Sequence, residues 1–310
     1  MKQGKVSENI IKRSVLKCIE NEMVGAAVGT DCAIFTGYIA NEVDIKCATH
    51  AIIRACNNAA VAGYNPESVS LSITMPETMR EIKLKNMMQE AASYAKATGI
   101  KIADGHSETV EGIKCPIITA TVLARKSEWI PGKLAAGQAI IMTKWMAMSG
   151  GARIAKERKD ELLTKYPYFI VEDAANLEQF YSILPEAAVA VRSGAISMND
   201  CSDGGVFAAL WQLADKDGVG LEVNLRDIAV RQETIEVCEY FDINPYKLRS
   251  DGSLLIVTED PEAMIEKLHA ENIPATCIGH ITDGLDRVII SGEDRRFLEE
   301  PRQDEGVMVQ

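Results

Sequence analysis

Hydrophobic positions recur at helical spacing in some segments of the chain and form short apolar runs in others, and the two kinds of segment alternate. The pattern predicts helices over residues 7–20, 47–62, 79–97, 175–182, 185–193, 205–217, 231–241 and 261–271. It predicts strands over residues 24–36 (with a turn), 68–75, 100–104, 115–124, 138–143, 220–225, 253–258, 275–282 and 287–292. Because strands and helices interleave in both halves, the sequence predicts two α/β-type domains.

The amino-acid composition of the sequence changes near residue 146. Residues 147–166 are first rich in glycine and then rich in Lys, Arg and Glu, after a long stretch of strand-like segments. We therefore expect one domain over residues 1–146 and a second over residues 147–310.

Composition and charge narrow the class of protein. Hydrophobic residues make up 47% and charged residues 25% of the 310 residues, which is typical of a globular protein. The net charge of −12 argues against nucleic acid as the main partner, but it leaves room for a phosphate held locally. No apolar run is long enough to span a membrane, and the N-terminal sequence lacks the apolar core of a signal peptide. The eight cysteines show no CxxC spacing, so we expect a reduced, cytoplasmic protein without membrane contact.

The sharpest local signal is Asp200 and Asp203 followed by the pair Gly204 and Gly205, directly before the apolar helix predicted over residues 205–217. Glycines permit positive φ and let backbone amides approach a ligand closely. The N-terminus of the following helix favours an anion, and an aspartate can hold a divalent cation that bridges to that anion. A turn followed by a helix cap would use the same residues, so both interpretations stay open here.

The first half carries three polar features in apolar surroundings. Asp31 lies in an otherwise apolar strand, where a lone carboxylate is costly unless it is paired or bound to metal. Asn57 and Asn58 interrupt a helix of Ala, Ile and Val, and their side chains need hydrogen-bond partners. The segment of residues 105–112, with His106, Ser107 and Glu108, reads as a polar loop between two strands. A substrate or metal contact and a plain hairpin loop both fit it.

These motifs, in this order, resemble the AIR synthase-related, PurM-like superfamily, and within it the branch of proteins similar to the hydrogenase maturation factor HypE. The resemblance runs almost from end to end. The matching segments are Gly4-Lys5, Gly29-Thr30-Asp31, residues 57–66, residues 105–108, residues 199–205, residues 250–255 and residues 278–281.

The resemblance implies a fold of two α+β domains, with the N-terminal domains pairing into a homodimer, and it implies binding of ATP with Mg²⁺. It implies metal roles for Asp31, Asn58 and Asp200 and phosphate contacts for the amides of Gly204 and Gly205. The remaining implied contacts are Lys5, Asn57, Ser107 and Asp203 to the nucleotide, and His106 and Glu108 to the substrate or its proton. Catalysis in this family activates an oxygen by phosphoryl transfer, which needs charge clamps on the phosphates more than a protein nucleophile.

The chain also departs from the family pattern. Thr30 and Asn58 stand where the family has carboxylates, and Ala48 stands where it often has glycine, so the metal cluster is expected to be thinner. Asp203 and Glu108 are candidates to replace the missing acids. The sequence ends in EGVMVQ and its last cysteine is Cys277, so we do not expect carbamoyl transfer to a C-terminal thiol.

Three hypotheses follow. The first is an ATP- and Mg²⁺-dependent enzyme acting on a small cytoplasmic metabolite. The second is a non-catalytic family member that binds a nucleotide or phosphate and serves as a sensor or partner protein. The third is a structural dimer with a vestigial groove. The neutral residues Thr30 and Asn58 favour the second hypothesis, whereas the retained acids Asp31, Asp200 and Asp203 favour the first.

Overall fold

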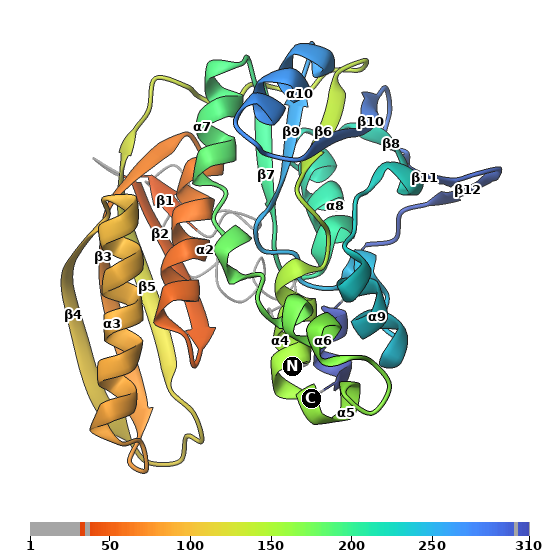
Figure 1. The fold of residues 1–310 in the computed structure, drawn as a ribbon. Helices are drawn as coiled ribbons and strands as arrows, with labels where there is room; N and C mark the ends of the chain where they lie inside the picture. The colour runs from red at the N-terminus through yellow and green to blue at the C-terminus, as the bar shows by residue number, and fades with distance from the viewer. Residues whose placement is uncertain (1–31, 35–37, 301–302, 310) are drawn as a thin grey trace. The chain divides into compact units, whose positions relative to one another are not determined.

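The computed structural model describes residues 32–34, 38–300 and 303–309 (Figure 1). The chain divides after Ile130 into two compact units, and each contains one β-sheet. We call them the first unit, which ends at Ile130, and the second unit, which begins at Pro131. The sequence placed the division near residue 146. It lies earlier because strand β6 (Ala139–Thr143) is an inner strand of the second unit's sheet.

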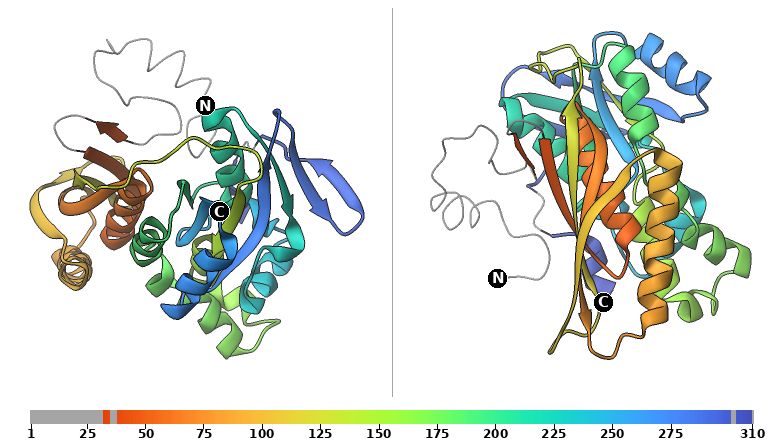
Figure 2. Two further views of the ribbon diagram at one scale, coloured as in Figure 1. Left: turned by 90° about the horizontal axis from the view of Figure 1, so that it is seen from above. Right: turned by 90° about the vertical axis from the view of Figure 1, so that its left-hand side faces the viewer.

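The first unit is a five-stranded sheet covered by two helices. Its strands, in the spatial order β1-β2-β5-β3-β4, are antiparallel except for the parallel pair β3–β4. The elements are β1 (Cys32–Ile34), β2 (Tyr38–Ile45), α2 (Ala48–Val61), β3 (Tyr64–Pro76), α3 (Glu81–Thr98), β4 (Lys101–Val110) and β5 (Ile117–Lys126). Both helices lie on one face of the sheet (Figures 1 and 2).

Alternation along the strands builds the core of the first unit. Ile118, Ala120 and Val122 of β5 are fully buried against the helices, and so is Ile52 of α2. The intervening residues point to the opposite face, where Val43, Ile45, Ile117 and Leu123 are 37–51% exposed. Among the described residues no helix covers that face.

Residues 101–110 form one continuous strand. The sequence predicted a short strand followed by a polar loop at residues 105–112, and that prediction was wrong. Strand β4 pairs in parallel with β3 as far as Pro76 and Val110, so its polar residues occupy the edge of the sheet. Edge strands tolerate polar side chains on both faces, which removes the alternation that would have revealed a strand.

The second unit is a seven-stranded sheet in the order β12-β11-β8-β10-β6-β9-β7. Only β8 and β11 are parallel neighbours, so both units are α+β rather than α/β in type. The further elements, in chain order, are α4 (Met148–Glu157), α5 (Lys159–Leu162), α6 (Tyr168–Ala175), η2 (Glu178–Phe180), α7 (Leu184–Arg192), β7 (Ser197–Cys201), α8 (Gly205–Asp217), β8 (Gly220–Asn224), η3 (Leu225–Asp227), α9 (Gln232–Tyr240), η4 (Pro245–Lys247), β9 (Ser253–Thr258), α10 (Pro261–Ala270), β10 (Ala275–Thr282), β11 (Arg287–Ser291), β12 (Asp294–Phe297) and η5 (Glu305–Val309).

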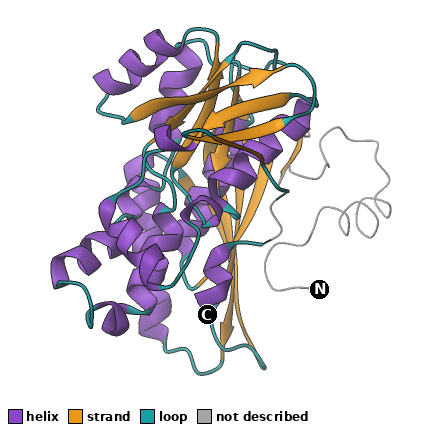
Figure 3. Ribbon diagram, turned by 90° about the vertical axis from the view of Figure 1, so that its right-hand side faces the viewer, coloured by secondary structure: helices purple, strands orange, loops and turns teal. Residues whose placement is uncertain are grey.

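Helices cover both faces of this sheet (Figure 3). Strand β9 is buried along its whole length, because Leu255 and Val257 join the cluster beneath α4, α6, α8 and α9 while Leu254 and Ile256 face the other way. Helices α7 and α10 contact β9, β6 and β10. A strand buried on both faces is apolar throughout, as the sequence of residues 253–258 shows.

The helix predicted over residues 175–182 is absent. Helix α6 ends at Ala175, and only the short 3₁₀ turn η2 follows. The carbonyls of Phe180 and Ser182 accept hydrogen bonds from the Lys144 ammonium at 2.7 and 2.9 Å. Those carbonyls are therefore directed at a buried side chain instead of at helical amides. Within the described residues, no helix is long and apolar enough to cross a membrane.

Candidate functional site

The glycine pair lies between strand β7 and helix α8. Asp200 is the fourth residue of β7 and pairs with Leu254 of β9, so this aspartate belongs to a strand rather than to a loop as predicted. The turn itself is short, because α8 begins at Gly205. β7 is the edge strand of the second unit's sheet, and it carries Asp200 to the end of the strand where the turn into α8 begins.

The two glycines have a local structural cause. Gly204 and Gly205 have φ of 80° and 65°, in the left-handed region that side chains rarely adopt. A Cβ at Gly205 would lie 2.5 Å from the Leu248 carbonyl oxygen and 2.6 Å from that of Tyr246. The close approach that this pair permits is therefore, in this structure, an approach of the chain's own backbone.

The amides of the pair are hydrogen-bonded. Gly205 N donates to the Ser202 carbonyl at 3.0 Å, which closes the turn. Gly204 N donates at 2.9 Å to the carboxylate of Asp304, a residue a hundred positions away in sequence. The predicted anion-binding position of the second unit is thus occupied by a carboxylate of the chain itself.

Arg249 is the basic group of this loop. Its guanidinium binds Oδ1 of Asp203 through Nε at 2.7 Å and through a second nitrogen, and its Nε lies 3.8 Å from Asp251 Oδ2. Asp251 is buried and accepts a 2.7 Å hydrogen bond from the Ser149 hydroxyl. Asp203, which the sequence offered as a substitute metal ligand, forms a charge-assisted pair with Arg249.

Asp200 is half-buried and stands next to the fully buried Cys201. Burial raises the pKa of the Cys201 thiol well above its ordinary value, and the negative charges of Asp200 and Asp251 raise it further. This thiol is therefore neutral at physiological pH and is a packing residue rather than a nucleophile. Asp200 and Asp251 are thus both near enough to this buried thiol for their charges to act on it.

In the first unit, the two asparagines of α2 differ in their surroundings. Asn57 is 1% exposed, whereas Asn58 is half-buried and donates through Nδ2 to Glu42 of β2 at 2.8 Å. Glu42 also forms a 3.0 Å ion pair with Arg54, and Arg54 donates to the Val43 carbonyl. A carboxylate thus lies beside position 58, supplied by the neighbouring strand.

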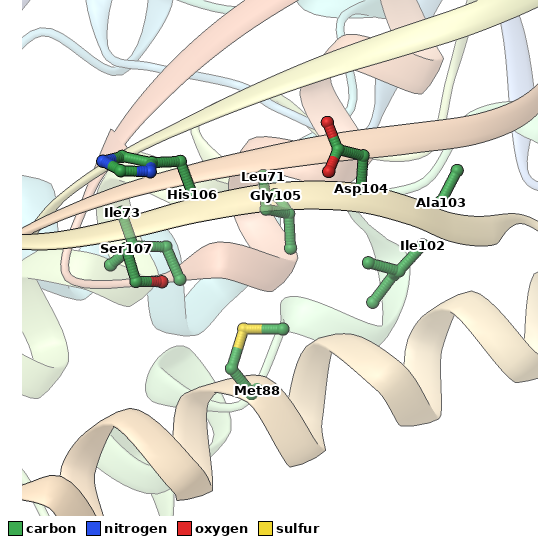
Figure 4. A pocket seen from close by; sticks show the side chains of 9 residues that line it. All are labelled: Leu71, Ile73, Met88, Ile102, Ala103, Asp104, Gly105, His106 and Ser107. Atoms are coloured by element: carbon green, nitrogen blue, oxygen red, sulfur yellow. The ribbon is translucent and has the colours of Figure 1, made fainter.

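His106, Ser107 and Glu108 lie along the edge strand β4. His106 Nε2 is 3.7 Å from Glu108 Oε2, and both side chains are more than half exposed. Figure 4 shows His106 and Asp104 directed away from α3, while Met88 of α3 faces the strand. Between β3, β4 and α3 lies a hollow of about 240 Å³, lined mainly by apolar side chains and by the 104–107 backbone.

Among the described residues of the first unit, His106 and Asn58 lie on different sides of the sheet. His106 pairs in register with Ser72 on the sheet face opposite the helices, whereas Asn58 belongs to a helix that covers the other face. Lys5 and Asp31 lie outside the described residues, as does Thr30, so the roles predicted for Lys5 and Asp31 stay predictions.

The oxygen donors of the described residues decide whether they could hold Mg²⁺. Among the described residues, no three His, Cys, Asp or Glu side chains are grouped closely enough to hold a metal ion. Magnesium, however, is commonly held by one or two carboxylates together with substrate phosphates. Asp200, with hard oxygen donors at the edge of the sheet, fits that simpler requirement.

Sequence reasoning missed Glu42, Arg54, Arg249 and Asp304 as neighbours of the candidate residues. Glu42 shares its face of β2 with the buried Ala40, whereas the large apolar residues Val43 and Ile45 lie on the exposed face, so the alternation in the sequence pointed the other way. Asp304 had no signal either, because its partner is a backbone amide far away in sequence.

Comparison with known proteins identifies the family. The profile described as "AIR synthase related protein, C-terminal domain" matches residues 135–291, half of the chain, and the corresponding N-terminal domain profile matches residues 14–125. A putative hydrogenase expression/formation protein of Methanocaldococcus jannaschii is 23% identical over 97% of this chain and 95% of its own length.

Two further proteins are similar. Carbamoyl dehydratase HypE of Rhodobacter capsulatus is 26% identical over 69% of this chain, and the match spans 62%, less than two thirds, of that relative. A crystal structure of the hydrogenase maturation protein HypE in complex with ATP shares the fold with a TM-score of 0.69 at 18% identity, covering 98% of this chain and 97% of that one. On the strength of the two profiles, the chain belongs to the AIR synthase related proteins, and its two α+β units carry the N- and C-terminal domains of that family.

Proposed function

We propose that the chain is an ATP- and Mg²⁺-dependent enzyme that transfers the γ-phosphoryl group of ATP to an oxygen of a small metabolite. The family contains ATP-using enzymes, and a structurally similar HypE is known in complex with ATP. The observation that carries the proposal is the anion on the Gly204 amide at the N-terminus of α8. This amide already holds a negatively charged oxygen, which is what a nucleotide phosphate would present.

The electrostatics of the loop favour that ligand. Helix α8 is 13 residues long, so its N-terminus carries the partial positive charge of a full helix dipole. Arg249 adds a guanidinium whose planar fork matches phosphate oxygens. Arg249 is held next to this helix N-terminus by its pair with Asp203, the residue before Gly204.

The chain's residues would divide the work as follows. Asp200 would hold Mg²⁺, which when bound neutralises phosphate charge as phosphoryl transfer proceeds. The Gly204 amide would orient a phosphate oxygen. Asp203 would keep Arg249 in place. The substrate contacts of His106 and Glu108, the nucleotide contacts of Lys5, Asn57 and Ser107, and the metal roles of Asp31 and Asn58 are proposed from the family resemblance.

The acceptor is proposed to be a small molecule rather than a protein thiol. The relative from Rhodobacter capsulatus is named a carbamoyl dehydratase. In this chain Cys277 lies within strand β10, and its thiol faces the Gly279 carbonyl at 3.7 Å. A thiol fixed in a sheet strand cannot travel to an active site, which argues against it as an acceptor.

A homodimer is part of the proposal. The uncovered face of the first unit's sheet exposes Val43, Ile45, Ile117 and Leu123, and Ile45 pairs directly with Ile117. A contiguous apolar sheet face on a folded unit is typical of an interaction surface. A second copy of the chain is the partner that the family resemblance implies for it.

A non-catalytic nucleotide-binding dimer is the second candidate. Asn58 is a neutral residue hydrogen-bonded to Glu42, and Asp203 is neutralised by Arg249, so few of the predicted metal ligands are available. Such a protein would bind the nucleotide and report it to a partner.

Conversion of ATP to ADP distinguishes the enzyme from the non-catalytic nucleotide-binding protein. The purified chain is incubated with ATP and Mg²⁺, and ADP formation is followed by phosphorus NMR, with the Asp200→Asn variant as the test and Asp283→Asn, an exposed carboxylate of the same unit, as the control. The enzyme proposal expects ADP to form with the native chain and the control, and at least tenfold more slowly with Asp200→Asn. Nucleotide binding without ADP formation would support the second candidate instead.

A further inference from the structure

Residues 303–309 return to the glycine turn and place a carboxylate on it. Both oxygens of Asp304 are used: Oδ2 accepts from Gly204 N at 2.9 Å, and Oδ1 accepts from Gly306 N at 2.8 Å. The Gly204 amide is the one that the proposed function assigns to a phosphate oxygen. The same donor cannot serve the carboxylate and a phosphate at once.

The environment of Asp304 resembles that of a bound anion. Burial raises the pKa of its carboxyl group, and the neighbouring charge of Asp203 adds to this effect. The amides of Gly204 and Gly306 and the charge of Arg249 act in the opposite direction, toward the ionised form. A carboxylate that loses water and receives amide bonds and a nearby guanidinium in return is in the situation of a ligand phosphate at a helix N-terminus.

The segment is attached to the second unit through η5 (Glu305–Val309) as well as through Asp304. Arg158 donates a hydrogen bond to the Val309 carbonyl at 2.7 Å, and Val309 packs against the hydrophobic core. Leu248 lies next to Gly306, and Leu248 also supports Gly205. The segment thus contacts the glycine turn directly and is held there without a strand or long helix of its own.

We propose that residues 303–309 act as an internal competitor for the nucleotide: the Asp304 carboxylate occupies the Gly204 amide in the free protein and is displaced when a nucleotide phosphate binds there. This regulation rests on the proposed nucleotide site. A phosphate group brings more negative charge and more acceptor oxygens than one carboxylate, so it outcompetes Asp304 at the same donor.

The alternative to the competitor proposal is that residues 303–309 stay bound to the glycine turn permanently. In that case, Asp304 stabilises the glycine turn in both the free and the bound protein, and its removal weakens nucleotide binding. The competitor proposal expects removal of Asp304 to strengthen nucleotide binding. The reason is that the apparent affinity is the intrinsic affinity multiplied by the fraction of molecules whose site is open.

The test compares full-length chains by isothermal titration with Mg·ADP. Asp304→Ala removes the carboxylate, and Asp304→Asn keeps its shape without its charge. Glu300→Gln, an exposed acidic residue close by in the same part of the chain, is the matched control. We expect Mg·ADP to bind about tenfold more tightly to both Asp304 variants, corresponding to the loss of one charge-assisted hydrogen bond, and unchanged to the control. Circular dichroism and thermal unfolding check that the variants are folded.

Hydrogen exchange on the native chain gives a second measurement that needs no substitution. Displacement removes the acceptor of the Gly306 amide, so Mg·ADP should accelerate exchange at Gly306. Equal or weaker binding to both Asp304 variants, or slower exchange at Gly306 with ADP, overturns the competitor while leaving the nucleotide site intact. Absence of Mg·ADP binding in every chain, variants included, overturns the proposed function and the competitor together.

Discussion

Two glycines with nearly equal φ stand at the two ends of helix α8, and they differ in what surrounds them. Gly205 has φ of 65° and Gly218 has φ of 66°. A Cβ at Gly205 would collide with two backbone carbonyl oxygens, whereas at Gly218 nothing lies within 4 Å. Comparing the two therefore separates backbone strain from steric exclusion within one helix.

We predict that Gly218→Ala lowers the free energy of unfolding by about 1 kcal/mol, the strain of a left-handed alanine. Gly205→Ala should cost about 2 kcal/mol more, because the added methyl group must also displace the backbone at residues 246–248. Urea unfolding of both variants measures the difference. Equal costs at the two positions would show that the packing of Gly205 against the 246–248 backbone does not matter for stability.

Residue-scale prediction succeeded where the signal was local. Gly204 and Gly205 were singled out because a glycine pair before an apolar helix indicates positive φ, and both residues have it. The origin of the close approach was not predictable, since Leu248 lies more than forty residues away. The pairing of Asp203 with Arg249 and of Gly204 with Asp304 was hidden for the same reason: the partners come together only through the fold.

At the scale of elements, a buried ion pair fixes the start of helix α7. Lys144, just after β6, has its ammonium bound to the Phe180 and Ser182 carbonyls and to Glu186 of α7 at 2.6 Å. Both side chains are about 95% buried. Burial lowers the pKa of Lys144, and the Glu186 carboxylate opposes that shift.

We predict that Glu186→Gln lowers the free energy of unfolding by about 3 kcal/mol, because it leaves the Lys144 charge buried without its counter-charge. Glu266→Gln, on the exposed side of α10, should change it by about 0.5 kcal/mol or less. Chemical denaturation compares the two variants. A loss at Glu186 no larger than that at Glu266 would mean that the amide satisfies Lys144 as well as the carboxylate does.

Elements with a strong apolar period were predictable within a few residues. Helix α8, with an apolar first half and glycine at both ends, lies at residues 205–217 as expected. Strands β9 and β10 likewise have the expected bounds. The second half of strand β4 was predicted as a loop, because an edge strand needs no apolar face. The helix at 175–182 was over-predicted because carbonyls of this segment accept hydrogen bonds from Lys144.

At the scale of the whole molecule, the sheet face of the first unit that no described helix covers is the proposed contact surface for a second copy of the chain. Val43 on this face is 50% exposed, and Ile82 on helix α3 is 52% exposed. The two residues are thus equally accessible but lie on opposite sides of the unit. They form a matched pair for testing which side contacts a second copy.

We predict that Val43→Lys converts a dimer to a monomer in size-exclusion chromatography with light scattering, while Ile82→Lys leaves the mass unchanged. A twofold interface contains each residue twice, so losing about 1.5 kcal/mol per valine weakens association roughly a hundredfold. Dissociation by Ile82→Lys and not by Val43→Lys would move the interface to the helical side.

The family could be identified from the order of motifs, and profile matches to both of its domains confirm it. The chemistry at the site was less accessible to sequence reasoning. Asp203 and Gly204 were singled out from the sequence, but their partners Arg249 and Asp304 belong to no motif considered. The acceptor substrate is therefore left to experiment.

The central claim is that the second unit binds a nucleotide through Mg²⁺ and Asp200. Isothermal titration of ATP into the native chain and into Asp200→Asn, each with Mg²⁺ and with EDTA, tests it most directly. We predict micromolar binding to the native chain that weakens at least tenfold without Mg²⁺, and the same loss in Asp200→Asn even when Mg²⁺ is present. Equal affinity in all four titrations, or no binding at millimolar ATP, would contradict it.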